Sequence, residues 1–182
     1  MTGQELQFEH WVNFYAITSS AAATLLGLLF VVITFAAERG RKDTSSLTTY
    51  LTPTVIYFTS VLLMSALLTI PDQTRFMAAI CICLGGIAGV GYSASLVIRK
   101  RTVSFYDRSD LFPYVFFPLA GYALIISGGL LLLLRPQIGV NLVAAGMLGL
   151  LGIGIRNSWA IAITIVSSRP SKIPQGDRTD VS

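Results

Sequence analysis

Few side chains in this sequence can do acid–base, nucleophilic or metal chemistry. The chain has a single histidine, His10, and nine acidic residues, which fall at the ends of apolar segments, in links or near the C-terminus. One histidine cannot complete a zinc site, and aspartyl chemistry within a membrane needs two carboxylates there. No serine elbow and no phosphate-binding glycine loop followed by lysine accompanies these groups. The sequence therefore predicts no enzyme, no cofactor and no metal.

The two cysteines, Cys81 and Cys83, lie two residues apart in an apolar segment. Helical neighbours two apart point to different sides, so these thiols are not expected to pair with each other. We interpret both as small buried apolar residues.

Polar groups inside an apolar helix form the most distinctive pattern, and they lie along residues 11–37. Stepping by alternating threes and fours collects one face of mainly small or polar residues: His10, Asn13, Ile17, Ser20, Thr24, Gly27, Val31, Thr34 and Glu38. This average spacing of about 3.5 residues is the period of a left-handed supercoil. Since lipid gives a helix no reason to carry such a face, we expect other helices or water to meet it.

Composition places this helix in a membrane protein. The 182 residues are 53% hydrophobic and only 12% charged, and the mean hydropathy is +0.69, whereas soluble domains carry about a quarter charged residues. Five apolar segments each reach the roughly 20 residues that cross a bilayer: 11–37, 48–70, 75–98, 111–134 and 138–166. We predict an all-α integral membrane protein, a five-helix bundle in one domain (residues 1–166), followed by a mobile cytoplasmic tail (residues 167–182).

The 13 basic residues predict the orientation of this bundle, because positive residues favour the cytoplasmic side. One side carries most of them: Arg39, Arg41, Lys42, Arg99, Lys100, Arg101, Arg108, Arg169, Lys172 and Arg178. The N-terminus is therefore expected outside and the C-terminus in the cytoplasm. Arg99, Lys100 and Arg101 are expected beside anionic lipid headgroups. The net charge of +4 thus reports cytoplasmic loops and predicts no nucleic-acid partner.

Two predicted helices carry faces of small residues that permit close helix packing. The third has Gly85, Gly89 and Ser93, and the fifth has Ala145, Gly149 and Gly152. Packing within the chain is sufficient to account for most of these residues.

Arg156 continues the small face of the fifth helix and is either a functional intramembrane charge or an anchor at the inner interface. We favour the anchor, together with Asn157 and Trp159. Glu38 is its nearest plausible counter-charge, so a Glu38–Arg156 pair is a further prediction.

Two interpretations of the first helix remain open. It is either the central helix of a bundle, packed from several sides, or the lining of a pore formed by several copies, with Ile17 and Val31 as rings that close by dewetting. Five helices are too few to enclose a conduit, so a pore predicts a homo-oligomer. The leading functional hypothesis is a channel for ions or small solutes. The alternative is a non-catalytic adaptor or regulator that binds a partner protein or anionic lipids through its basic cytoplasmic face.

Residues 14–15 (FY) and 21–31 (AAATLLGLLFV), together with residues 156–159 (RNSW), carry a resemblance. The chain resembles a group of small, uncharacterised bacterial multi-pass inner-membrane proteins. The resemblance implies a bacterial inner-membrane location and brings no known activity.

Overall fold

The computed structural model describes residues 6–38, 44–102 and 108–167, and all regular structure in these ranges is helical. The helices are α1 (Leu6–Glu38), α2 (Thr44–Leu68), α3 (Arg75–Thr102), α4 (Arg108–Leu134) and α5 (Pro136–Ser167). All five are long and apolar enough to cross a membrane. The coarse prediction of an all-helical, multi-pass membrane protein is therefore confirmed. Residues 168–182 of the predicted tail and residues 103–107 of the third-to-fourth link lie outside the described residues.

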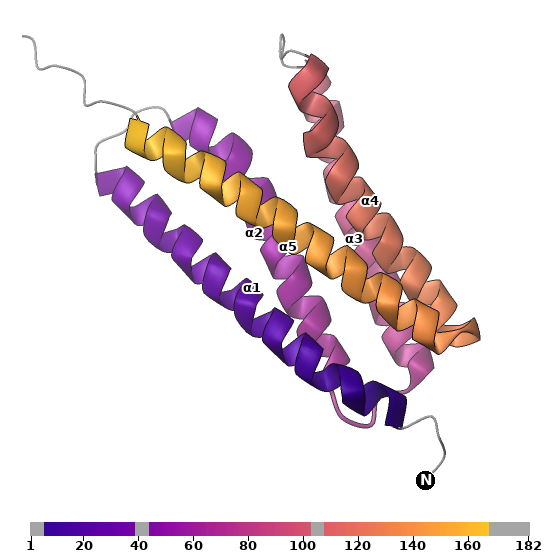
Figure 1. Cartoon of the computed structure of the whole chain (residues 1–182). Coiled ribbons are helices and arrows are strands. Elements are labelled where there is room, and N and C mark those ends of the chain that lie inside the picture. The colour runs from indigo at the N-terminus through magenta and orange to yellow at the C-terminus, as the bar shows by residue number, and fades with distance from the viewer. Residues whose placement is uncertain (1–5, 39–43, 103–107, 168–182) are drawn as a thin grey trace, which may run out of the picture.

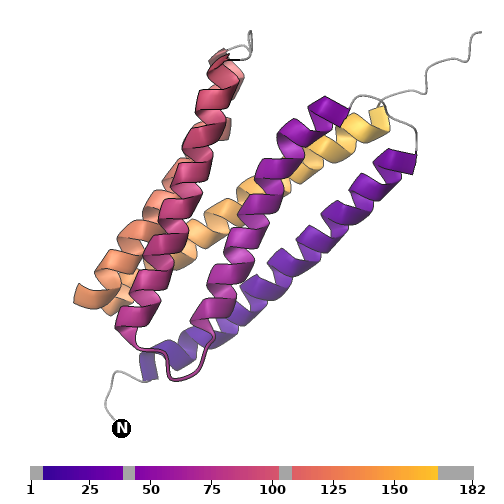
Figure 2. The ribbon, with the colours of Figure 1, turned by 180° about the vertical axis from the view of Figure 1, so that it is seen from behind.

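The helices form a bundle in which α2 and α5 hold the middle positions (Figure 1). The most extensive contact joins α4 and α5, followed by the α3–α4 and α1–α2 contacts, while α1 touches α5 only slightly. Seen from both sides, α1 and α5 run in the same direction, and the α3–α4 pair leans away from α1 and α2 at one end (Figures 1 and 2). α1 is thus an edge helix, and α5 connects it with the α3–α4 pair.

Glycines allow α4 and α5 to approach closely. A methyl group added to Gly128 would lie 2.7 Å from the carbonyl oxygen of Gly139, and one added to Gly146 would lie 2.7 Å from that of Gly121. Lipid tails are as apolar as leucine, so helices in a membrane associate through dispersion contacts and hydrogen bonds more than through a hydrophobic drive. The absence of side chains at these positions is therefore what permits this interface.

The link between α2 and α3 is a tight turn. Asp72 adopts a left-handed conformation (φ 56°), which aspartate tolerates better than most residues. Thr74 then caps α3, because its Oγ1 accepts a hydrogen bond from the amide of Met77 at 3.2 Å. The turn makes α2 and α3 antiparallel neighbours, although they diverge along their length (Figure 2).

The main buried core draws on α2, α3, α4 and α5, and α1 adds one side of it. Its largest fully buried side chains include Tyr15, Phe58, Tyr122, Ile125 and Leu132. A second, smaller cluster of Leu29 and Ile161 joins α1 to α5, with the half-buried Leu51 and Val55 of α2 packed against it. This cluster fixes which parts of α1 and α5 lie at the same height.

Candidate functional site: the outward face of the first helix

The polar and small face predicted along α1 points away from the protein's own helices. Its members with described side chains are all exposed, and we call them the outward face: Asn13, Ile17, Ser20, Thr24, Gly27, Val31, Thr34 and Glu38. Ile17 is 70% exposed, and a methyl group added to Gly27 would meet no atom within 4 Å. The side chain of His10 lies outside the described residues. Among the residues that the structure describes, this face therefore has no partner helix.

The opposite side of α1 carries a second repeat that packs against α2 and α5. It consists of residues with the same alternating spacing of four and three, all buried or half-buried: Trp11, Tyr15, Thr18, Ala22, Leu25, Leu29 and Val32. Residues two apart on a helix differ by about 200°, so this repeat lies almost opposite the outward face. Its 3.5-residue spacing was readable in the sequence, but its apolar residues did not stand out in an apolar segment.

The position of α1 overturns its interpretation as the central helix of a bundle. It contacts α2 and, slightly, α5 among the described helices, and only 17% of its membrane-spanning segment is buried, against 50% for α5. The small residues 19–23 were expected to admit neighbours from several sides. Of these, Ala22 is buried, Ser19 is half-buried, and Ser20, Ala21 and Ala23 are exposed.

Two hydroxyls on the outward face are already bonded within the helix. Thr24 Oγ1 donates to the carbonyl oxygen of Ser20 at 2.8 Å, and Thr34 Oγ1 donates to that of Phe30 at 3.0 Å. A threonine that bonds back to its own helix costs little in lipid and still offers an oxygen lone pair to water. The face is consequently compatible with a helix partner as well as with water.

A second exposed face lies on α5. Ala145, Gly149, Gly152 and Arg156 are all exposed, and a methyl group added to either glycine would meet no atom within 4 Å. The expectation that this face packs within the chain is wrong, because other glycines of α5 (Gly139, Gly146 and Gly154) make the close contacts. All these glycines recur at helical spacing. The glycines that contact other helices therefore could not be distinguished in the sequence from the exposed ones.

The small face of α3 differs, since it does pack within the chain. A methyl group on Gly85 would collide with the side chain of Met64, and one on Gly89 would collide with the ring of Tyr122. Ser93 is buried and donates to the carbonyl oxygen of Gly89 at 2.9 Å. Arg99, Lys100 and Arg101 lie in the last turns of α3, but their side chains are outside the described residues.

The register of the helices argues against the predicted Glu38–Arg156 pair. Leu29 and Ile161 share one buried cluster, and α1 and α5 run the same way (Figure 1). Glu38 lies beyond Leu29, whereas Arg156 lies before Ile161, which separates the two by about 20 Å along the bundle at 1.5 Å per residue. The pair is therefore not formed within one chain.

Asn157, grouped with Arg156 and Trp159 as an interfacial anchor, is instead part of the interior. It is 3% exposed, and its Oδ1 has no hydrogen-bond partner among the described residues, whereas Trp159 is 69% exposed. The residues share one stretch of sequence but point in different directions, since successive helical positions turn by about 100°.

A hydrogen bond between the hydroxyls of the half-buried Ser60 and the buried Tyr122 was not anticipated from the sequence. The Tyr122 hydroxyl of α4 lies 3.0 Å from Ser60 Oγ of α2, and its ring passes over Gly89 of α3. The ring of Tyr57 lies 6.4 Å from that of Tyr122. This hydrogen bond ties α4 to α2 across α3, and its members are dispersed too widely in the sequence to suggest contact.

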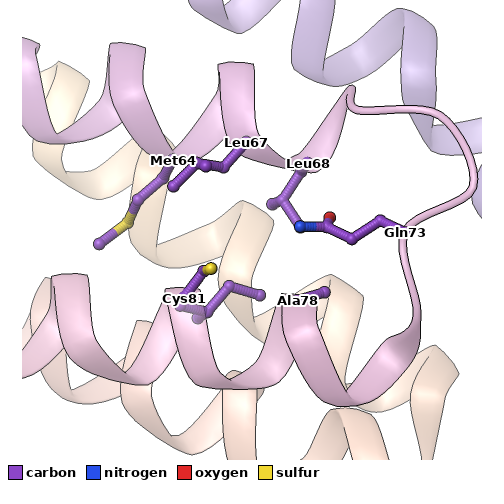
Figure 3. A pocket seen from close by; sticks show the side chains of 7 residues that line it. Met64, Leu67, Leu68, Gln73, Ala78 and Cys81 are labelled. Atoms are coloured by element: carbon purple, nitrogen blue, oxygen red, sulfur yellow. The ribbon is translucent and has the colours of Figure 1, made fainter.

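The two cysteines lie in different surroundings, and both are free thiols. Cys81 lines a shallow hollow between α2 and α3, together with Met64, Leu67, Leu68 and Gln73 (Figure 3). Cys83 instead lies beside Gly129 of α4. Within the described part of the chain, no group of three histidine, cysteine or acidic side chains is close enough to hold a metal ion.

Comparison with known proteins adds no family to this description. No family model, no curated protein and no solved structure matches the chain. The functional argument therefore rests on the two open faces of the protein, on α1 and α5.

Proposed function

We propose that this protein is a homo-oligomeric conduit for ions or small solutes in a bacterial inner membrane, with the outward face of α1 turned toward its axis. The observation that carries the proposal is the exposure of the whole outward face. Asn13 and Glu38 mark its two ends, and both are exposed, with none of the described helices covering them. Polar groups on an open face are costly against lipid tails. Contact with a partner chain or with water lowers their free energy.

The composition of the outward face suits a narrow water-filled path. Ser20, Thr24 and Thr34 offer hydroxyl oxygens, while Ile17 and Val31 would form apolar rings that close the path by dewetting. Glu38 lies at one mouth, where carboxylates favour cations. Several copies are needed, because α1 lies at the edge of the protomer and, among the described helices, none lies beyond it.

The proposed orientation has the N-terminus outside and the C-terminus in the cytoplasm. It is supported by the concentration of basic residues in the links that would then face the cytoplasm. Glu38 would accordingly lie at the cytoplasmic mouth and Asn13 near the outer one.

Thiol accessibility at two adjacent positions tests the conduit. Gly27→Cys places a thiol on the outward face without a collision, and Leu28→Cys places one on a neighbouring exposed position outside it. Both changes are made in a protein with Cys81 and Cys83 replaced by alanine. We expect a charged methanethiosulfonate to modify the Gly27→Cys variant in liposomes and reduce its ion flux. The same reagent should leave the Leu28→Cys variant unmodified, because lipid covers that position.

Equal reactivity at both positions, or flux in reconstituted protein no higher than in empty liposomes, would contradict the conduit. The adaptor hypothesis would then become the better proposal. It predicts that neutralising Arg99, Lys100 and Arg101 abolishes binding to anionic liposomes.

A further inference from the structure

We infer that α2 and α5 form a hinged gate at the end of the bundle where α2 begins. When the gate opens, α2 bends at Pro53, and water reaches the buried amide of Asn157. We call the contact of the two helices around Thr54 and Asn157 the seam; both side chains are buried there. The gate does not depend on the conduit, because it follows from the packing of α2 and α5.

The amide of Asn157 is poorly accommodated while the seam is closed. Its side chain is 3% exposed, and its Oδ1 has no hydrogen-bond partner among the described residues. Other buried polar side chains of the bundle do have an acceptor, as Thr18, Ser65 and Ser93 show. A buried polar atom without a partner has lost its bonds to water and gained none in return. Separation of the helices would restore those bonds, which favours opening at this position.

Thr54 of α2 and Asn157 of α5 lie at nearly the same height. On one side of them, the ring of Phe58 lies against Gly154. On the other side, Leu51 packs against the smaller cluster that joins α1 to α5. At this end α4 leans away from α5 (Figures 1 and 2), so α2 and α1 are the described helices that remain beside α5. A movement of α2 is therefore sufficient to uncover the seam.

Pro53 weakens α2 at the height of the seam. The helix begins at Thr44, so this proline lies in the helix interior, directly before Thr54. Proline has no amide hydrogen, so the carbonyl oxygen four residues earlier loses its helical donor, and the proline ring crowds the preceding turn. Sharp bends in helices occur mainly at such positions. The part of α2 before Pro53 can thus move away from α5 while the part after it stays packed.

The packing around α2 also differs on the two sides of Pro53. The part after it belongs to the main core, where Phe58 and Val61 are fully buried. The smaller cluster, beside the part before it, has two buried residues among those described, Leu29 and Ile161. Regions with few buried apolar contacts open locally at a lower free energy than the core does. We therefore expect the seam to open while the main core stays intact.

Opening of the seam would also loosen one end of α1. Leu29 is held in the smaller cluster, and Val31 and Glu38 of the outward face follow it along the helix. A movement of this end would change the width of a path at Val31 and the position of Glu38 at its mouth. This consequence, unlike the gate itself, rests on the conduit proposed above.

Thiol labelling at a buried position tests the gate. Thr54→Cys places a thiol in the seam, and Ser65→Cys is its matched control on the same helix, both in full-length protein with Cys81 and Cys83 replaced by alanine. Both native side chains are fully buried, and each lies three residues from an end of the membrane-spanning segment Leu51–Leu68. In lipid nanodiscs, where a reagent reaches both membrane faces, we expect a charged methanethiosulfonate to label Thr54→Cys and to leave Ser65→Cys unlabelled.

Two further substitutions identify the hinge and the amide. Pro53→Ala restores the missing backbone hydrogen bond, and Asn157→Leu removes the polar group that gains from water. Each should slow the labelling of Thr54→Cys by about fivefold. Asn141→Leu is the control for the second change, because Asn141 is exposed on the same helix and should leave the rate unchanged.

Hydrogen–deuterium exchange gives the same comparison in the unsubstituted protein, where amides 54–57 should exchange faster than amides 61–64. Equal labelling of Thr54→Cys and Ser65→Cys, or equal exchange in the two groups of amides, would overturn the gate. An unchanged labelling rate in Pro53→Ala or in Asn157→Leu would overturn it as well. Labelling requires no ion flux, so a protein that is labelled as expected but does not conduct would contradict only the conduit.

Discussion

The α4–α5 interface and the open faces of α1 and α5 use glycine in opposite ways. Between α4 and α5, Gly128 and Gly139 approach so closely that neither can accept a methyl group. On the open faces, Gly27, Gly149 and Gly152 meet no atom that such a group would touch. Glycines thus allow close packing at one interface and leave other surfaces that none of the described residues covers.

The largest effect on the free energy of unfolding is expected at the α4–α5 interface. Gly128→Ala places a methyl group 2.7 Å from both the carbonyl oxygen of Gly139 and the side chain of Val143, so α4 and α5 must move apart. Overpacking of this kind should lower the free energy of unfolding by about 2 kcal/mol. Reversible unfolding in mixed micelles measures the change.

Gly91→Ala is the control for this variant, because it adds the same methyl group to an open position of α3. An equal loss of stability in both variants would mean that replacing a helical glycine is enough to lower the free energy of unfolding. The close approach of α4 and α5 would then not be its cause.

A smaller effect on the free energy of unfolding, of opposite sign, is expected on the buried side of α5. In the described part of the chain, the Oδ1 of Asn157 is buried without a hydrogen-bond partner, and such a group costs about 1–3 kcal/mol in a protein interior. Asn157→Leu has a similar volume and no polar atom, so it should raise the free energy of unfolding by about 1 kcal/mol. The same unfolding assay checks this value.

Asn141→Leu serves as its control, since Asn141 is an exposed residue of the same helix and should change stability little. If Asn157→Leu were destabilising instead, the Asn157 oxygen would have to be satisfied by a buried water, and the interior of α5 would be more polar than its packing indicates.

The helices were predictable from the sequence because each is a long apolar segment, and the outward face was predictable because its polar residues interrupt such a segment. The contacts were not. The closed and open glycines of α5 follow the same helical spacing, and only the positions of α4 and α2 separate Gly146 and Gly154 from Gly149 and Gly152. The edge position of α1 was equally hidden, because a 3.5-residue repeat predicts a helix partner without stating whether that partner belongs to the same chain.

The smallest effect on stability, and the sharpest test of the open faces, is expected at Thr24. Its hydroxyl bonds to the carbonyl oxygen of Ser20 and its side chain is exposed, so Thr24→Val should change the free energy of unfolding by less than about 0.5 kcal/mol. If water meets the outward face, the added methyl group removes a hydration site and should lower ion flux in liposomes. Thr18 is the control, because it makes the same type of bond, to Phe14 at 2.7 Å, on the buried side of α1. Thr18→Val should leave flux unchanged, so equal flux in both variants would show that the outward face meets a helix or lipid and not water.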